Sequence, residues 1–133
     1  MRGATLQTEA RAHTPQAARR AFVAALNRGD LEGASACFAR NGCMVTPDAT
    51  TIHGREAIGA LLTQLIDRRT EIEVRLSDRL EAAEATLAAE RWKIASEGVD
   101  GRSFVRESIA TLVLCRVEGE WKLSILAPWG WGT

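Results

Sequence analysis

The chain has 133 residues, 46% of them hydrophobic and 26% charged, which is enough for one domain with a substantial core and too little for two. Seventeen basic residues balance seventeen acidic ones without blocks of either sign, so neither nucleic acid nor an anionic membrane is expected as a partner. Three cysteines without CxxC or metal-finger spacing favour reduced thiols and a cytoplasmic protein, with a Cys37–Cys43 disulfide as the minor alternative. No apolar run approaches the ~20 residues needed to cross a bilayer.

The first expected element is a helix preceded by a tail. Residues 1–13 are polar and charged without an apolar cluster, so they are expected to form a flexible tail. Residues 14–133 are expected to form the single domain. Thr14 can cap a helix whose first residue is Pro15, and apolar residues then recur at helical spacing to about residue 28.

Two more helices and one short strand are expected before residue 70. A short helix over residues 31–39 is followed by a short strand over residues 43–46. Pro47 and Asp48 then form a turn. The clearest helix of the sequence covers residues 55–68, because its large aliphatic residues fall on one face.

From residue 71 the apolar period changes to two, which is typical of half-buried strands. Strands are expected over residues 71–80 and 92–96, and also in the alanine-rich run 82–89, where propensity alone would allow a helix. Asp100-Gly101 and Glu118-Gly119 each lie between extended runs and are expected to form two-residue hairpin turns. The second half of the chain is therefore an antiparallel sheet.

Two-residue turns would fix which side chains share a face of this sheet. If Val99 faces Arg102, then Arg91 lies opposite Ala110 and Lys93 opposite Ser108. The face that would then point toward the helices combines basic, small and aromatic side chains, as a wet ligand pocket would. It would carry Arg91, Lys93, Arg106, Ser108 and Trp129. A slip of one residue would exchange the two faces.

The opposite face would expose an apolar patch in a monomer. Its members are expected to be Trp92, Ile94, Ile109 and Val113. A second copy of the chain is the natural cover for such a patch, so a homodimer through this outer face is expected.

Three segments carry a resemblance to a known superfamily: Ala21-Phe22 to Gly29-Asp30-Leu31, Ile52-His53-Gly54-Arg55-Glu56-Ala57-Ile58, and Glu118-Gly119-Glu120-Trp121-Lys122-Leu123. In this order the chain, over residues 14–131, resembles the SnoaL-like proteins, also called nuclear transport factor 2-like or ketosteroid isomerase-like. The resemblance implies an α+β cone, in which a curved, mostly antiparallel sheet wraps around three N-terminal helices. Members include enzymes and binding modules, so the resemblance alone does not specify an activity.

Within that superfamily Glu90-Arg91-Trp92 resembles a strand that presents an arginine to the cavity. The resulting hypothesis is a cofactor-independent isomerase- or cyclase-type enzyme acting on a polyketide-like or oxygenated small molecule. Histidine is the side chain best suited to proton transfer at physiological pH, so His53 would be the general base, with Asp48 as the alternative base, and Arg91 would stabilise an enolate oxygen. The expected substrate-binding residues are Lys93, Arg106, Ser108, Trp129, Phe22 and Met44.

Each candidate also has a simpler structural explanation. Arg91 and Lys93 would pair with a helix carboxylate, or lie on the outer face if the register is wrong. His53 would be a surface residue before a helix, and Asp48 would bond its own backbone. The chain has no tyrosine, which the isomerases of the resembled superfamily use as the oxyanion donor, so a non-catalytic ligand-binding or dimeric assembly module is the alternative function. No metal or nucleotide motif is present, and no cofactor is expected.

Overall fold

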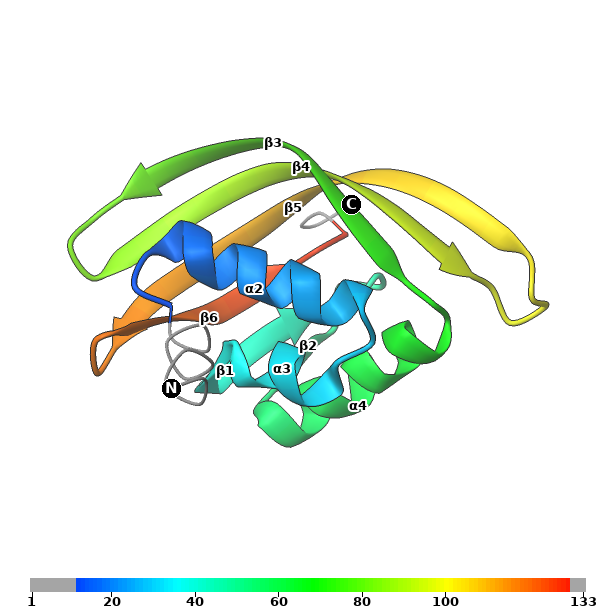
Figure 1. Cartoon of the computed structure of the whole chain (residues 1–133), viewed down its shortest axis with the longest axis horizontal. Helices are drawn as coiled ribbons and strands as arrows, with labels where there is room; N and C mark the ends of the chain where they lie inside the picture. The colour runs from blue at the N-terminus through cyan, green and yellow to red at the C-terminus, as the bar shows by residue number, and fades with distance from the viewer. Residues whose placement is uncertain (1–11, 130–133) are drawn as a thin grey trace, which may run out of the picture.

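In the described part of the chain, three helices pack into the concave face of one six-stranded sheet (Figure 1). The computed structural model describes residues 12–129. The helices are α2 (Pro15–Asn27), α3 (Leu31–Ala36) and α4 (Arg55–Asp67). The strands are β1 (Phe38–Val45), β2 (Thr51–His53), β3 (Glu71–Glu81), β4 (Ala85–Glu97), β5 (Ser103–Val117) and β6 (Glu120–Ala127).

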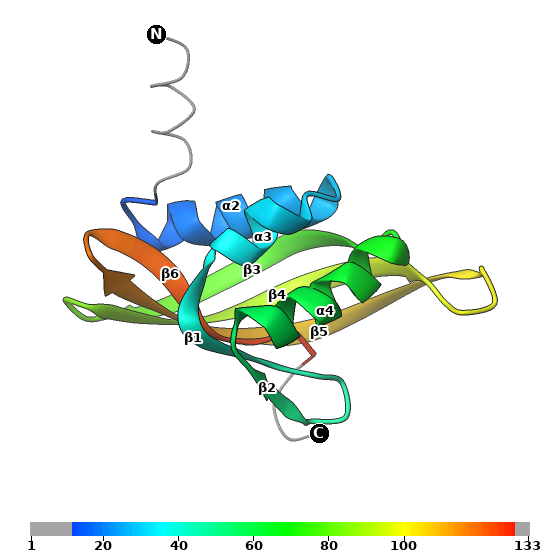
Figure 2. The ribbon, with the colours of Figure 1, turned by 90° about the horizontal axis from the view of Figure 1, so that it is seen from below.

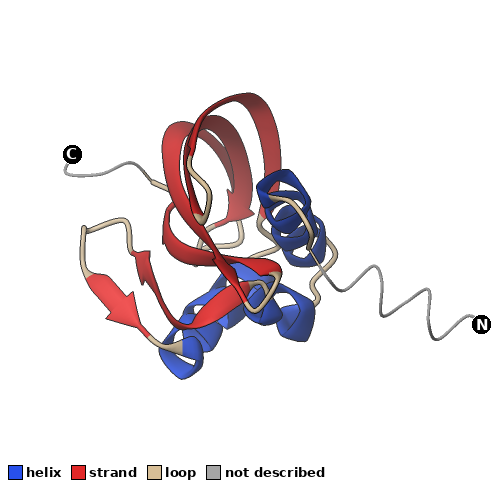
Figure 3. Cartoon of the chain, turned by 90° about the vertical axis from the view of Figure 1, so that its left-hand side faces the viewer, coloured by secondary structure: helices blue, strands red, loops and turns tan. Residues whose placement is uncertain are grey.

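The sheet has the order β2-β1-β6-β5-β4-β3. Its neighbouring strands are antiparallel except β1 and β6, which run parallel. Figure 2 shows the β4–β5 hairpin extending beyond the helices, and Figure 3 shows the sheet curving around them. The predicted α+β cone fold is confirmed.

Helix α2 begins as local rules predict. The hydroxyl of Thr14 accepts a hydrogen bond from the backbone N–H of Ala17 at 3.0 Å, and Pro15 is the first helical residue. Gly29 ends the turn with a φ of +76°. The expected tail, residues 1–13, lies mostly outside the described residues, and the domain boundaries stay predictions.

The second helix is shorter than the sequence predicts. Helix α3 ends at Ala36, and Phe38 already belongs to β1, so the expected helix over residues 31–39 is wrong at its end. The reason is tertiary: the backbone N–H of Leu123 donates to the carbonyl of Cys37 at 2.8 Å, where β1 joins β6. The fully buried Phe38 ring also packs edge-on against Phe22, with centroids 5.6 Å apart.

The two hairpins of the sheet differ in how well their turns were predicted. Val117 lies opposite Glu120, so the turn at Glu118-Gly119 has two residues as expected. The β4–β5 connection has five residues, 98–102, because Glu97 lies opposite Ser103. A hydrogen bond of 2.8 Å from the Gly98 N–H to the Arg102 carbonyl closes it. The register of β4 against β5 therefore differs by one residue from the prediction.

This one-residue difference exchanges the faces of β4. Arg91 lies opposite Ile109 rather than Ala110. Trp92 and Ile94 are buried against the helices instead of lying on the outer face, while Arg91 is exposed. The prediction for β5 itself holds: Ile109 is exposed on the outer face and Ala110 is buried.

One side chain, that of Asn27, connects the end of α2 to strand β3. The amide of Asn27, at the end of α2, donates to the carbonyl of Ile72 at 2.9 Å and accepts from the N–H of Ile72 at 2.7 Å. Both backbone groups lie on β3, which is the edge strand in the sheet formed by the described residues. This contact fixes the end of α2 to the sheet edge. Among residues 12–129 no helix is long and apolar enough to cross a membrane.

Candidate ligand-binding site

An apolar cavity lies between α2, α4 and the concave face of the sheet, where the chain leaves β6 at Trp129; we call it the Trp129 cavity. The space open to the centre of a water molecule is about 10 Å³, room for about one water molecule. Ten of its eleven lining residues are apolar and none is ionisable. They are Phe22, Leu26, Met44, Leu65, Thr70, Ile72, Trp92, Ile94, Leu126, Pro128 and Trp129.

The single polar residue of the lining, Thr70, already has a partner. Its hydroxyl lies 3.0 Å from that of Ser96, which in turn lies 3.3 Å from the carbonyl oxygen of Arg68. Ser96 can donate to that carbonyl and accept from Thr70, so both buried hydroxyls are satisfied. The cavity wall is therefore a hydrocarbon surface, and such a surface does not favour ions or ordered water.

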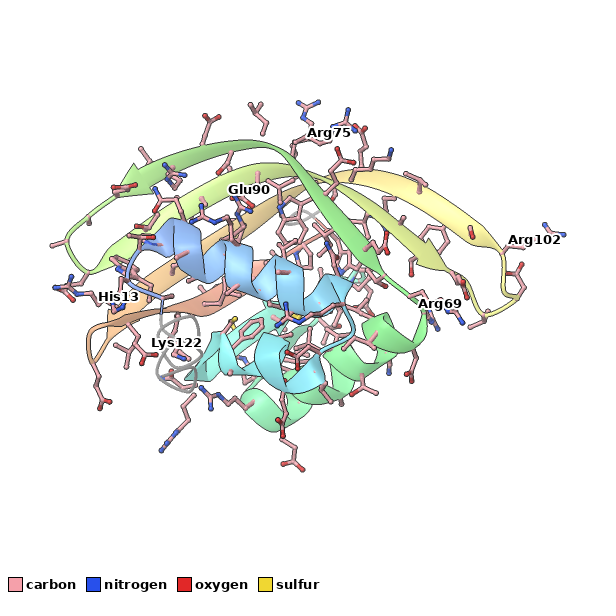
Figure 4. All side chains as sticks on the ribbon, viewed as in Figure 1. His13, Arg69, Arg75, Glu90, Arg102 and Lys122 are labelled. Carbon is pink, nitrogen blue, oxygen red and sulfur yellow. The ribbon has the colours of Figure 1, made fainter. Side chains whose placement is uncertain are left out.

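A buried carboxylate positions the largest side chain of the wall. Glu90 is 2% exposed and lies between β4 and α2 (Figure 4). Its Oε1 accepts from the indole Nε1 of Trp92 at 2.8 Å. Its Oε2 accepts from the hydroxyl of Ser77 at 2.9 Å and from the Nε of Arg19 at 3.1 Å. These donors compensate the buried charge and hold the indole of Trp92 against the cavity.

Two residues on β5 hold the segment at the mouth of the cavity. The hydroxyl of Ser108 donates to the carbonyl of Pro128 at 2.6 Å. The guanidinium carbon of Arg106 lies 5.1 Å from the centre of a Trp129 ring, a cation–π contact. The half-buried Trp129 thus forms the outer wall of the cavity.

Three of the predicted substrate-binding residues, Phe22, Met44 and Trp129, line this cavity, and Arg106 and Ser108 contact its last segment. The predicted inward position of Arg91 and Lys93 is wrong. Both lie on the outer face of β4, because the β4–β5 connection has five residues instead of two. The geometric reason for assigning them to a pocket is thereby lost.

The two candidate bases also lie away from the cavity. His53 is exposed on β2 and lies opposite Cys43, whereas the alternate residues Met44 and Ile52 pack against the core. Strand alternation therefore points the imidazole outward. Asp48 is exposed, and hydrogen bonds from the Thr46 hydroxyl and the Thr50 N–H lower the pKa of its carboxyl. A lowered pKa makes this carboxylate a weaker base.

Sequence reasoning missed most of the cavity wall. Leu26 and Leu65 could have been predicted from the sequence, since they belong to the apolar stripes of α2 and α4. Trp92 and Ile94 were assigned to the wrong face by the register error. The remaining members, Thr70, Ile72, Leu126 and Pro128, are brought to the cavity by tertiary packing.

The thiols do not add a reactive group to the site. All three cysteines are free, so no Cys37–Cys43 disulfide forms. The thiol of Cys37 donates to the carbonyl of Gly33 at 3.3 Å, and burial raises its pKa to about 11, so it stays protonated at neutral pH. Within residues 12–129 no three His, Cys, Asp or Glu side chains are grouped so that they could hold a metal ion.

Solved structures share this fold. An uncharacterized Caulobacter vibrioides protein with a cystatin-like fold is 22% identical, with a TM-score of 0.75 over 84% of this chain and 83% of that one. A ketosteroid isomerase-like protein from Erwinia carotovora is 14% identical, with a TM-score of 0.72 over 85% and 90%. An NTF2-like protein from Novosphingobium aromaticivorans is 17% identical, with a TM-score of 0.68 over 83% and 75%. At these identities the similarity shows the fold alone.

No curated protein matches the sequence. The sequence pattern of the SnoaL-like domain matches residues 19–122, a span that includes most of α2, all of α3 and α4, and the sheet from β1 to the start of β6. The chain therefore belongs to the SnoaL-like domain family.

Proposed function

We propose that this protein is a cytoplasmic, non-catalytic SnoaL-like protein that binds a small apolar molecule in the Trp129 cavity. The observation that carries the proposal is the lining, which comes from both sides of the cone and contains no ionisable group. Apolar walls with few polar groups are typical of small-molecule sites. The cavity is smaller than a typical small-molecule site. A ligand therefore enters only when Trp129 moves outward and enlarges the cavity. Its cation–π contact with Arg106 opposes that movement by only about 0.5–1 kcal/mol at an exposed position.

Isomerase- or cyclase-type chemistry through His53, Asp48 and Arg91 is the competing proposal. It requires a base within about 2.6–3.2 Å of the substrate proton, directly or through one water. The outward direction of all three side chains supports binding over catalysis. The competing proposal would gain support if His53→Ala abolished turnover of a carbonyl substrate while ligand affinity stayed unchanged.

The binding proposal is tested by filling the cavity. Ile94 is 1% exposed and lines the cavity, so Ile94→Phe places additional carbon atoms in the space that a ligand would use. We expect the native protein to bind a naphthyl fluorescent probe saturably, and Ile94→Phe to bind it at least about tenfold more weakly, a loss of about 1.4 kcal/mol. Fluorescence titration measures both affinities.

The matched control is Leu31→Phe, which makes a similar substitution on the exposed surface of α3. This variant should bind the probe like the native protein. Equal binding by Ile94→Phe, or no saturable binding by the native protein, would contradict the proposal.

We also propose that two copies of the chain pair through the outer face of the sheet. Cross-strand register aligns Leu80, Leu87, Val113 and Ile125 in one row over β3, β4, β5 and β6; we call this the outer apolar row. Leu80 is 73% exposed and Leu87 44%. Soluble monomers rarely expose a continuous apolar surface of this kind, and the exposure of Leu80 and Leu87 supports self-association.

A charge in the outer apolar row should separate the copies. Leu87→Glu would bury a carboxylate without a partner at the interface, at a cost of several kcal/mol, so dimerisation should weaken at least about a hundredfold. Sedimentation velocity measures this change. The control Val99→Glu alters a 90% exposed residue at the tip of the β4–β5 hairpin and should leave association unchanged. A native protein that sediments as a monomer would refute this second proposal.

A further inference from the structure

One cation lies beside the mouth of the Trp129 cavity in the described part of the chain. Arg106 is the cross-strand neighbour of Ile94, a residue of the cavity wall, and its guanidinium lies over Trp129, the outer wall. Directly opposed residues of an antiparallel pair have Cβ atoms about 4.5–5.5 Å apart. Arg106 is thus placed at the boundary between the hydrocarbon wall and the solvent.

The charge of Arg106 has no acidic partner among residues 12–129. Other arginines of the protein pair with carboxylates, for example Arg19 with Glu90 at 3.1 Å and Arg102 with Asp100 at 3.7 Å. Arg106 forms no such ion pair with a described residue, and its contact is with an aromatic ring. A guanidinium has five N–H donors, and the cation–π contact with Trp129 occupies none of them with a hydrogen-bond acceptor, so they stay available to an incoming anion.

We infer that the ligand of the Trp129 cavity is an amphipathic carboxylate, with its hydrocarbon body inside the cavity and its carboxylate on the guanidinium of Arg106. This inference rests on the proposed binding function. The lining offers no charged or unsatisfied polar group to a head group, so the head group must lie at the mouth. A carboxylate matches one guanidinium in charge and can accept two parallel N–H bonds.

A phosphate fits the same position less well. At neutral pH it carries close to two negative charges, and a single guanidinium would leave part of that charge uncompensated beside Trp129 and Ile94. A neutral head group would gain nothing from the position of Arg106. The observations therefore favour a monoanion attached to an apolar body.

The test compares two ligands of almost identical shape, 4-phenylbutyrate and 4-phenylbutyramide, by isothermal titration calorimetry. We expect the native protein to bind the carboxylate at least about tenfold more tightly than the amide, because a charge-assisted bond replaces a neutral one. Arg106→Gln should remove this preference, so that the variant binds the carboxylate and the amide with equal affinity. The control Arg102→Gln changes an exposed guanidinium at the tip of the same hairpin (Figure 4) and should retain the preference.

The outcomes separate this inference from the function on which it rests. Equal affinity of the native protein for both ligands, or a preference that survives Arg106→Gln, overturns the amphipathic carboxylate and leaves the apolar binding site standing. No binding of either ligand, together with no binding of the naphthyl probe, overturns both.

Discussion

Replacing Glu90 by alanine is expected to lower the free energy of unfolding by about 3–5 kcal/mol. The carboxylate is 2% exposed and accepts hydrogen bonds from Arg19, Ser77 and Trp92. Its removal leaves a guanidinium that is 19% exposed without its counter-charge. It also leaves a buried indole N–H without an acceptor. The loss is large because these donors cannot turn to solvent without disturbing the packing of α2 on the sheet.

Urea unfolding followed by tryptophan fluorescence measures this change. The control is Glu81→Ala, which breaks an exposed ion pair of 3.2 Å with Arg79 and should cost at most about 1 kcal/mol. Glu90→Gln keeps an acceptor for Trp92 but not the charge, so its stability should fall between those of the native protein and Glu90→Ala. If Glu90→Ala lost no more stability than Glu81→Ala, Glu90 would not support the cavity wall.

The elements predicted correctly are those whose signals are local. Thr14 and Pro15 start α2 through a hydrogen bond and a fixed φ, both within four residues. Glu118 and Gly119 form the two-residue turn with φ values of +52° and +82°, the pair of positive angles that such a hairpin requires. No distant part of the chain is needed for either decision, so the sequence alone determines them.

The β4–β5 connection shows where local reasoning fails. Asp100-Gly101 has the composition of a two-residue turn, but the connection is closed one step earlier by the hydrogen bond from the Gly98 N–H to the Arg102 carbonyl, and the chain uses five residues. This longer connection shifts the register of β4 against β5 by one residue. Because side chains alternate, Arg91 therefore lies on the outer face instead of in the pocket. The apolar residues Trp92 and Ile94 alternate with charged ones and carried the correct signal. The assumed turn length led to the wrong face, although the alternation of apolar and charged residues predicts the correct one.

The candidate site was predicted only in part for a related reason. Phe22 lies on a helical stripe and Trp129 at the end of a strand, so both could be identified from periodicity. Thr70 and Pro128 reach the cavity only because α4, β3 and β6 meet there. The contact of Glu90 with Trp92 depends on the true face of β4. A site assembled from separate elements requires the register to be known first.

Phe22→Ala is expected to cost about 3–5 kcal/mol of stability, the range for deleting a fully buried aromatic ring. Phe22 is 0% exposed, packs edge-on against Phe38 and lines the Trp129 cavity. The void left by its ring should therefore join the existing cavity. An enlarged apolar cavity stays dry and can take up a small aromatic molecule.

The thermal midpoint of Phe22→Ala should therefore rise when benzene is added, and rise more than that of the native protein, because ligand binding to the folded state adds stability by mass action. Differential scanning calorimetry with and without benzene measures both shifts. The matched control is Phe104→Ala, which removes a ring that is 45% exposed and should cost little stability and gain nothing from benzene. A large loss of stability without rescue by benzene would mean that the helices collapse into the void. The cone would then behave as a solid core, and the case for a binding cavity next to Phe22 would fail.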